Sequence, residues 1–210
     1  MSEENAPIDA NEPELPAIDF QSPGRFAVYN PDNQPGLSAE PREPAPFQLG
    51  SHAALERFDR PEQAQAHALA LLLQARQNLC LYSPDLEAWL YSHSSVQQAC
   101  TQFLLASPKN RLRILVRDVG KPVRQGHRLL NLARRITSNL HIRRINPDHP
   151  ADECAYLLAD DRGLLLREQP EQYAGYALYN DPGRVRQRQA QFDQAWDLSL
   201  LDPDLRSFLL

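Results

Sequence analysis

The sequence has 210 residues, a formal net charge of −5 and a hydrophobic share of 42%, which suffices for one domain with a real core plus some additional chain. No apolar run approaches the roughly 18 residues that a membrane helix needs, and the acidic start MSEENAPIDA is unlike a signal peptide. Composition therefore excludes a transmembrane segment and predicts a soluble, cytoplasmic protein.

The charge and the prolines are distributed unevenly. Residues 1–51 carry nine acidic residues against two arginines, and nine of the eighteen prolines precede residue 47. Such a segment buries too little apolar surface to offset its ordering entropy. We therefore predict a disordered or extended arm over residues 1–51 and a folded domain over residues 52–210.

Helical and strand periods alternate through the rest of the chain. Helices are predicted at about residues 61–75, 94–107, 127–137 and 182–198, with a short helical turn at residues 86–91. Strands are predicted at about residues 79–82, 112–118, 140–145, 155–159, 164–167 and 173–179. The stretch Ala155–Gly163 combines a buried strand with an acidic turn. This alternation predicts an α/β sandwich with a mostly parallel central sheet.

Cofactor and metal signatures are missing from the sequence. The three cysteines, Cys80, Cys100 and Cys154, are far apart and form no CxxC pair, which favours buried free thiols in a reducing compartment. No HxH or HxxxH pair is present for a metal, and no phosphate-binding glycine loop or dinucleotide fingerprint occurs. We expect neither a metal nor a cofactor.

Several segments together suggest a family. Ala75–Pro84 has an Ala-Arg pair before an apolar strand, Arg111–Asp118 fits the pattern R(I/V)xILxxD, and Arg135–Arg144 leads into a short strand of the IxxR type. Phe192 and Trp196 lie on the last predicted helix. Over residues 58–200 this order resembles one half of the phospholipase D superfamily fold. It is also similar to a bacterial domain that often follows a GNAT-type acetyltransferase.

The family's catalytic motif, His-x-Lys-x4-Asp, is missing. The resemblance implies that its His attacks phosphorus and its Lys holds the phosphoryl oxygens. Aligning the motif's Asp with Asp160 or with Asp161 puts Glu153 and Ala155, or Cys154 and Tyr156, at the His and Lys positions. Leu164–Glu168 offers no counterpart of the family's Gly-Ser and Asn. We therefore predict an inactive phospholipase D-like scaffold with no catalytic residues, not an enzyme.

The positive signal is a basic region, residues 109–150, with eleven lysines and arginines against two acidic residues. Arginine suits phosphate-rich partners because its guanidinium binds in a bidentate way. The candidate binding residues are Arg113, Arg117, Arg124, His127, Arg128 and Arg143. The alternative is that these arginines lie on solvated helix faces and pair with acidic residues of the C-terminal third. The absence of aromatic residues for base stacking from this region favours that alternative.

The leading hypothesis is a non-catalytic binding or adaptor module for a polyanion (nucleic acid or a phospholipid head group) or for a protein partner. A homodimer is also open, because single-copy members of the family pair in this way. Two alternatives remain: a phosphodiesterase or transferase with a relocated site around His127 and the nearby arginines, and an accessory subunit of an acetyltransferase.

Overall fold

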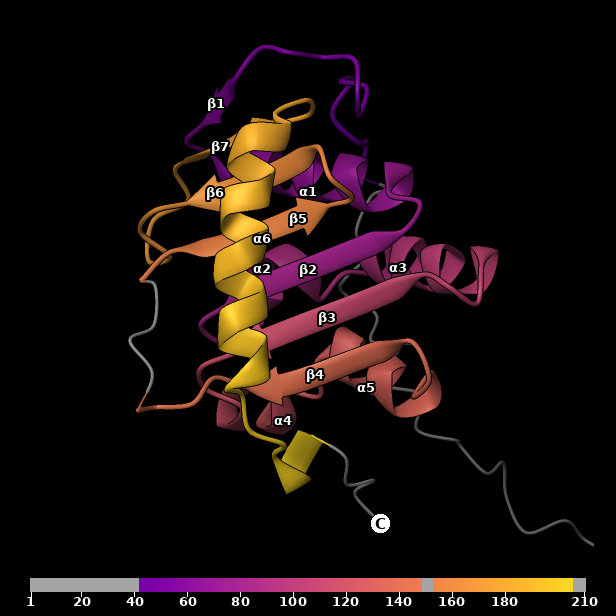
Figure 1. The fold of residues 1–210 in the computed structure, drawn as a ribbon, viewed down its shortest axis with the longest axis vertical. Coiled ribbons are helices and arrows are strands. Elements are labelled where there is room, and N and C mark those ends of the chain that lie inside the picture. The colour runs from indigo at the N-terminus through magenta and orange to yellow at the C-terminus, as the bar shows by residue number, and fades with distance from the viewer. Residues whose placement is uncertain (1–41, 149–152, 206–210) are drawn as a thin grey trace, which may run out of the picture. The chain divides into compact units, whose positions relative to one another are not determined.

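A computed structural model of the chain describes residues 42–148 and 153–205, which form a seven-stranded sheet with helices on both faces (Figure 1). The strands are β1 (Glu56–Phe58), β2 (Asn78–Ser83), β3 (Arg111–Val116), β4 (Leu140–Arg144), β5 (Ala155–Ala159), β6 (Gly163–Arg167) and β7 (Gly175–Leu178). The helices are α1 (Pro61–Gln74), α2 (Ala88–Tyr91), α3 (Ser94–Ala106), α4 (Gly120–Arg124), α5 (Arg128–Arg135) and α6 (Pro182–Asp197), followed by a 3₁₀ turn, η2 (Pro203–Leu205).

The strand order is β1-β7-β6-β5-β2-β3-β4, and the sheet is mostly antiparallel. Only β2–β3 and β3–β4 pair in parallel, whereas the other four pairs are antiparallel. The predicted mostly parallel sheet is therefore wrong. Parallel neighbours need a long crossover, and helices provide one before β3 and β4, but β5, β6 and β7 follow one another through turns and loops without a helix.

The two faces of the sheet are covered unequally. Helices α1, α2, α3 and α5 pack on one face in the larger core cluster, and α6 alone crosses the other face (Figure 1). Phe192 and Trp196 anchor α6 there, stacked on each other at a centroid distance of 5.8 Å. Every residue of β5 and β6 is buried because both faces are covered at the centre of the sheet.

Local signals set the ends of the longer helices. Helix α1 begins with Pro61 at its first position, where the missing N–H costs nothing, and Gln63 Oε1 accepts from the backbone N–H of Arg60. Asp181 caps α6, since its carboxylate accepts from the backbone N–H of Arg184. Two elements escaped the sequence prediction: β1, which has only three residues, and α4, whose Gly120 and Pro122 favour a loop.

Residues 42–51, the end of the predicted arm, pack on α1. The Gln74 side chain accepts from the Leu49 backbone N–H at 2.8 Å and donates to the Phe47 carbonyl at 2.9 Å. The Phe47 ring stacks on His67 at 5.6 Å, and the Gly50 N–H donates to the Tyr179 carbonyl. The remainder of the predicted arm, residues 1–41, lies outside the described residues.

All three cysteines are buried free thiols, as the sequence predicts. Burial raises the pKa of Cys100 to about 12, which keeps it a thiol at neutral pH. Within the described ranges, no helix has the length and apolarity needed to cross a membrane, and no three His, Cys, Asp or Glu side chains gather in a way that would hold a metal ion.

Candidate functional site

Asp160, one of the two candidates for the aspartate of the family motif, has a structural contact. The Asp160 carboxylate accepts backbone N–H groups of Arg76, Gln77 and Asn78 at 2.8–3.0 Å, where the chain enters β2. Asp161 contacts only the neighbouring Arg162 among the described ion pairs. Aligning the motif on Asp160 puts its His and Lys positions at the start of β5, at the carboxyl end of the antiparallel β2.

A buried ion pair lies at this carboxyl end. Arg167, the last residue of β6, pairs with Glu87, and the two residues are 0% and 4% exposed. The Ser83 hydroxyl donates to Glu87 Oε2 at 3.1 Å. Arg167 Nη1 donates to the carbonyls of Pro170 and Gln172 at 3.0 and 2.9 Å. We call Ser83, Glu87 and Arg167 the buried cluster.

The register of the sheet places the buried cluster beside the position where the family motif has its lysine. Ala155 of β5 is the cross-strand partner of Arg167 in β6, so their side chains lie on the same face. With the motif aligned on Asp160, Ala155 stands at the lysine position, and an arginine of the neighbouring strand lies next to it. This arginine already has a carboxylate partner.

The backbone that carries Glu87 is strained. Leu86 and Glu87 have φ angles of 62° and 40°, a region that costs a non-glycine residue on the order of 1 kcal/mol or more. The Asp85 carboxylate accepts from the Glu87 N–H at 3.0 Å and supports the turn. This turn directs Glu87 into the core instead of into solvent.

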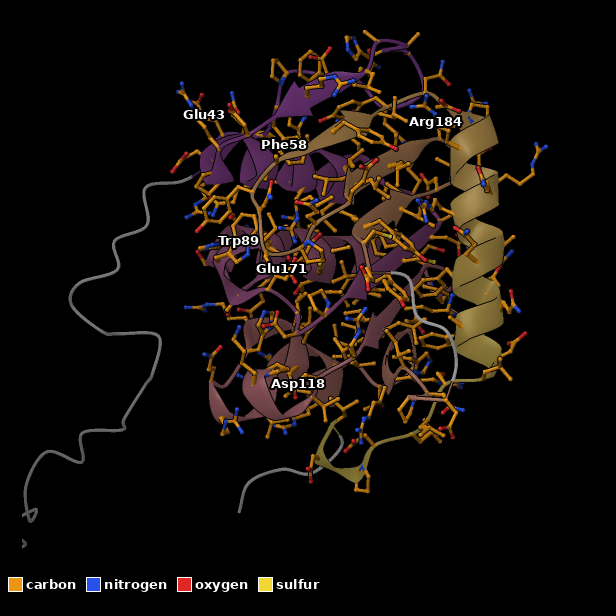
Figure 2. All side chains as sticks on the ribbon, turned by 90° about the vertical axis from the view of Figure 1, so that its left-hand side faces the viewer. Glu43, Phe58, Trp89, Asp118, Glu171 and Arg184 are labelled. Carbon is orange, nitrogen blue, oxygen red and sulfur yellow. The ribbon has the colours of Figure 1, made fainter. Side chains whose placement is uncertain are left out.

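An aromatic cover separates the buried cluster from solvent. The Trp89 ring lies 4.9 Å from the Arg167 guanidinium carbon, and Tyr173 meets the Trp89 ring edge-on at 4.8 Å. Figure 2 shows Trp89 and Glu171 close together over the middle of this side of the molecule. Burial lowers the pKa of Arg167 to about 10, against the opposing pull of Asp85 and Glu171, so Arg167 stays charged at neutral pH.

These contacts limit the chemistry of the site. The Ser83 hydroxyl is fully buried and donates to a carboxylate that also binds Arg167. Neither Ser83 nor Glu87 is open to an incoming phosphodiester, and the charge of Arg167 is neutralised. The buried cluster therefore has the geometry of a structural ion pair.

Arg113 and Arg143 are brought together on the α6 face. Arg113 pairs with Asp193 at 2.8 Å, and its guanidinium lies 5.1 Å from the Phe192 ring and 5.5 Å from the Trp196 ring. The Arg143 guanidinium lies 4.5 Å from the same Trp196 ring. Both arginines thus fasten α6 to the sheet.

The other candidate binding residues lie at or near the carboxyl ends of the parallel strands. His127 is 1% exposed, and its Nδ1 accepts from the Leu129 N–H as the cap of α5; burial lowers its pKa to about 4. Arg128 is half-buried and donates to Gln97. Arg117 and Arg124 are exposed.

Four exposed cations are carried by β3, β4 and α4 where the parallel strands end. Arg117 directly follows β3, and Arg144 is the β4 residue opposite Val116. Lys121 of α4 pairs with Asp85 near the end of β2, and Arg124 ends α4. We call Arg117, Lys121, Arg124 and Arg144 the strand-end surface.

The buried cluster was missed by sequence reasoning. The sequence places Ser83 at the end of a strand and Glu87 in a short helical turn. It places Arg167 at the polar end of another strand. One signal was available, because Arg167 follows the apolar run Leu164–Leu166. Its partner, however, lies 80 positions earlier in the chain, and no local pattern links the two.

Comparisons with known proteins bear on the family and on the fold. A family profile described as "Domain of unknown function (DUF7931)" matches residues 60–208, and no curated protein matches the chain. The archaeal chromatin protein TrmBL2, whose structure is described as showing a novel mode of DNA binding, aligns with a TM-score of 0.52 and 10% identity over 71% of this chain and 55% of its own. This chain thus spans about half the length of TrmBL2.

Two further solved structures align along nearly their whole length. NucT from Helicobacter pylori has a TM-score of 0.50 and 9% identity over 70% of this chain and 98% of its own. Nuc from Salmonella typhimurium, described as a phospholipase D family member, has a TM-score of 0.48 and 9% identity over 70% and 94%. At such identities the likeness concerns the fold alone, which this chain shares with TrmBL2 and NucT. These neighbours support the phospholipase D-like fold that the sequence resemblance predicts.

Proposed function

The chain belongs to the family described as "Domain of unknown function (DUF7931)", and we propose that it is a non-catalytic module that binds a polyanion through the strand-end surface. The observation that carries this proposal is the buried cluster. The ion pair of Glu87 and Arg167 lies beside Ala155, the lysine position when the motif is aligned on Asp160, and this supports a non-catalytic role. The four side chains of the strand-end surface, which stay exposed near it, are cationic.

The position of the strand-end surface supports a ligand. In open α/β sheets, ligands bind outside the carboxyl ends of the strands, and arginine and lysine there attract phosphate groups. Carboxylates also lie among the four cations: Asp85 pairs with Lys121, Asp202 pairs with Arg144 at 3.7 Å, and the exposed Asp118 accepts from the Gly120 N–H. Arg117 and Arg124 are therefore the residues whose variants test this surface. A protein of the same fold, TrmBL2, is described as binding DNA, so duplex DNA is the first probe to use.

Binding would be measured by fluorescence anisotropy with labelled duplex and single-stranded DNA between 50 and 200 mM salt. The wild-type affinity is expected to fall steeply with salt, by a logarithmic slope of about −0.9 per phosphate contacted on duplex DNA. Arg117→Glu with Arg124→Glu is expected to weaken binding about 10-fold or more and to reduce the slope by about 2.

The matched control makes the same charge change at the other end of the strands. Lys109 precedes β3 and Arg135 ends α5, and both are exposed. Lys109→Glu with Arg135→Glu is expected to leave most of the binding intact. If the two double variants lose affinity equally, binding depends on net charge alone and the strand-end surface is not the site.

A phosphodiesterase built around His127 is the enzymatic alternative. The ring is buried and caps a helix, which leaves it little access to a substrate, so we do not propose this activity. The chain is expected to show no hydrolysis of bis(p-nitrophenyl) phosphate above the blank. Turnover that is present in the wild type and lost in His127→Ala would reverse this choice.

A further inference from the structure

A pocket of about 820 Å³ lies at the β1 edge of the sheet, beside the first turn of α6. Among its polar lining residues are Arg57, Asp59, Glu168, Gln172, Tyr176 and Arg184, which come from β1 and the residue after it, the β6–β7 loop, β7 and α6. Phe58 also lines it, and Figure 2 shows Phe58 and Arg184 at the same end of the molecule. None of the strand-end residues lines this pocket.

A tyrosine ring with two arginines forms the centre of the pocket. Arg57 of β1 and Tyr176 of β7 are cross-strand partners, so their side chains lie on the same face of the sheet. The Arg184 guanidinium carbon lies 5.9 Å from the centroid of the Tyr176 ring. The ring is half-buried, packed against the smaller core cluster below α6, and is therefore held in place.

The two guanidinium groups are available for an anion. Arg57 is exposed, and Arg184 is about half exposed, with its Nε 3.6 Å from the Asp181 carboxylate. An exposed pair of this kind contributes little to stability, so Arg184 can turn towards a ligand at low cost. Two arginines next to each other are well suited to a phosphate, which guanidinium binds in a bidentate way.

The rest of the lining suits the other parts of a nucleotide. The half-buried Tyr176 ring offers a stacking surface for a base, and stacking on aromatic side chains is a common means of holding bases. Asp59 and Glu168 supply acceptors for ribose hydroxyls and base N–H groups, and Gln172 supplies both donor and acceptor groups. The volume falls within the range of pockets that hold small organic ligands.

We propose that this pocket binds a nucleoside monophosphate group, with the base on Tyr176 and the phosphate between Arg57 and Arg184. The group belongs either to a free mononucleotide or to the terminal nucleotide of a single strand. Because the pocket shares no residue with the strand-end surface, this proposal stands whether or not that surface binds DNA.

The test is calorimetric titration of the full chain with AMP, GMP, CMP and UMP, beside adenosine and inorganic phosphate. Binding of at least one mononucleotide is expected, with adenosine and phosphate weaker. Tyr176→Leu is expected to reduce the affinity on the order of 10-fold, the usual effect of removing one stacked base. Arg57→Gln with Arg184→Gln is expected to bring the affinity down to that of adenosine.

The control is Arg186→Gln, an exposed arginine of the same helix that does not line the pocket. It should bind as the wild type does. Because Tyr176 contributes to the core, its variant is checked by thermal unfolding, and the two exposed arginines provide a test that leaves the core untouched. The proposal is overturned if no mononucleotide binds at 5 mM, if inorganic phosphate binds as well as AMP, or if Arg186→Gln weakens binding as much as the pocket variants.

A competition experiment identifies the source of the nucleotide. A labelled single-stranded octamer with a 5′-phosphate is titrated with AMP. Displacement of the octamer by AMP, lost in Tyr176→Leu, supports recognition of a strand end. Mononucleotide binding without octamer binding supports a free nucleotide, and octamer binding that AMP and Tyr176→Leu both leave unchanged counts against the pocket.

Discussion

Arg167 and Arg113 are both strand arginines with a carboxylate partner and an aromatic neighbour, yet their surroundings differ. In the pair of Arg167 and Glu87 the side chains are 1% and 4% exposed, whereas in the pair of Arg113 and Asp193 they are 25% and 48% exposed. Burial lowers the pKa of Arg167. For Arg113 burial acts in the same direction, but the pull of Cys80 and Asp193 outweighs it and the pKa is raised.

The comparison shows that burial, not the presence of an ion pair, decides what losing a partner costs. A buried charge without its partner keeps its full desolvation penalty, whereas a charge near solvent is rehydrated. The two arginines therefore make the same type of contact with different consequences. Three experiments on stability separate them.

The largest effect is expected for Arg167→Met. The substitution removes the cation and leaves Glu87 buried at the end of the strands, so the free energy of unfolding should fall by about 3–5 kcal/mol. Urea denaturation followed by circular dichroism measures the change. Glu87→Gln combined with Arg167→Met removes both charges and is expected to recover more than half of the loss. A single variant within about 1 kcal/mol of the wild type would show that water reaches the buried cluster.

The next effect concerns pH and comes from His127, which is buried near the same end of the sheet. Its pKa is lowered from 6.5 to about 4, first by burial and least by His93, against the hydrogen bond with the Leu86 backbone and the charge of Asp85. Between these two pH values the unfolded chain binds more protons than the folded chain. The free energy of unfolding is therefore highest above pH 6.5 and should fall by up to about 3 kcal/mol as the pH drops to about 4.

His127→Asn keeps a side chain that accepts at the helix cap but removes the titrating group. Urea denaturation at pH 7, 5.5 and 4.5 is expected to show a flatter profile for this variant than for the wild type. The lowered pKa of His67 acts in both proteins and cancels in the difference, which therefore reports His127 together with its interaction with His93. Parallel profiles would mean that the His127 ring is solvated in the folded chain.

The smallest effect is expected for Asp193→Asn. The partner charge of Arg113 is lost, but both side chains are partly exposed, so the free energy of unfolding should fall by about 1 kcal/mol or less. The difference between wild type and variant should shrink further in 0.5 M salt, because exposed pairs are screened. A loss as large as that of Arg167→Met would remove the contrast between the two arginines.

The sequence predicted the elements better than their pairing. Helical spacing and proline at the first position located α1, and an apolar run located β3, because these signals act over a few residues. The same alternation predicted parallel pairing for strands that are antiparallel in most of the sheet. The strands after β4 pair as neighbours through turns and loops, and the prediction extended to them the crossover rule that holds for β2, β3 and β4.

The candidate site was less predictable for a related reason. Arg117 and Arg124 were identified from charge density, which is a local property. Glu87 and Arg167 come from distant segments, and only the fold brings them together. Arg113 and His127 resemble ligand-binding residues in the sequence, but their contacts with Asp193 and with the cap of α5 appear only when α6 and the sheet are in place.

The contacts between residues 42–51 and α1 determine where the amino-terminal part of the chain can be trimmed. Cutting before residue 42 leaves the Gln74 bonds and the Phe47–His67 stack in place. Cutting after residue 51 would expose one side of α1 to solvent. The His67 imidazole, whose pKa is lowered by burial, would then be hydrated. A shortened protein that lacks residues 1–41 should accordingly start at Arg42, so that a change in binding at the strand-end surface is not confused with a loosened core.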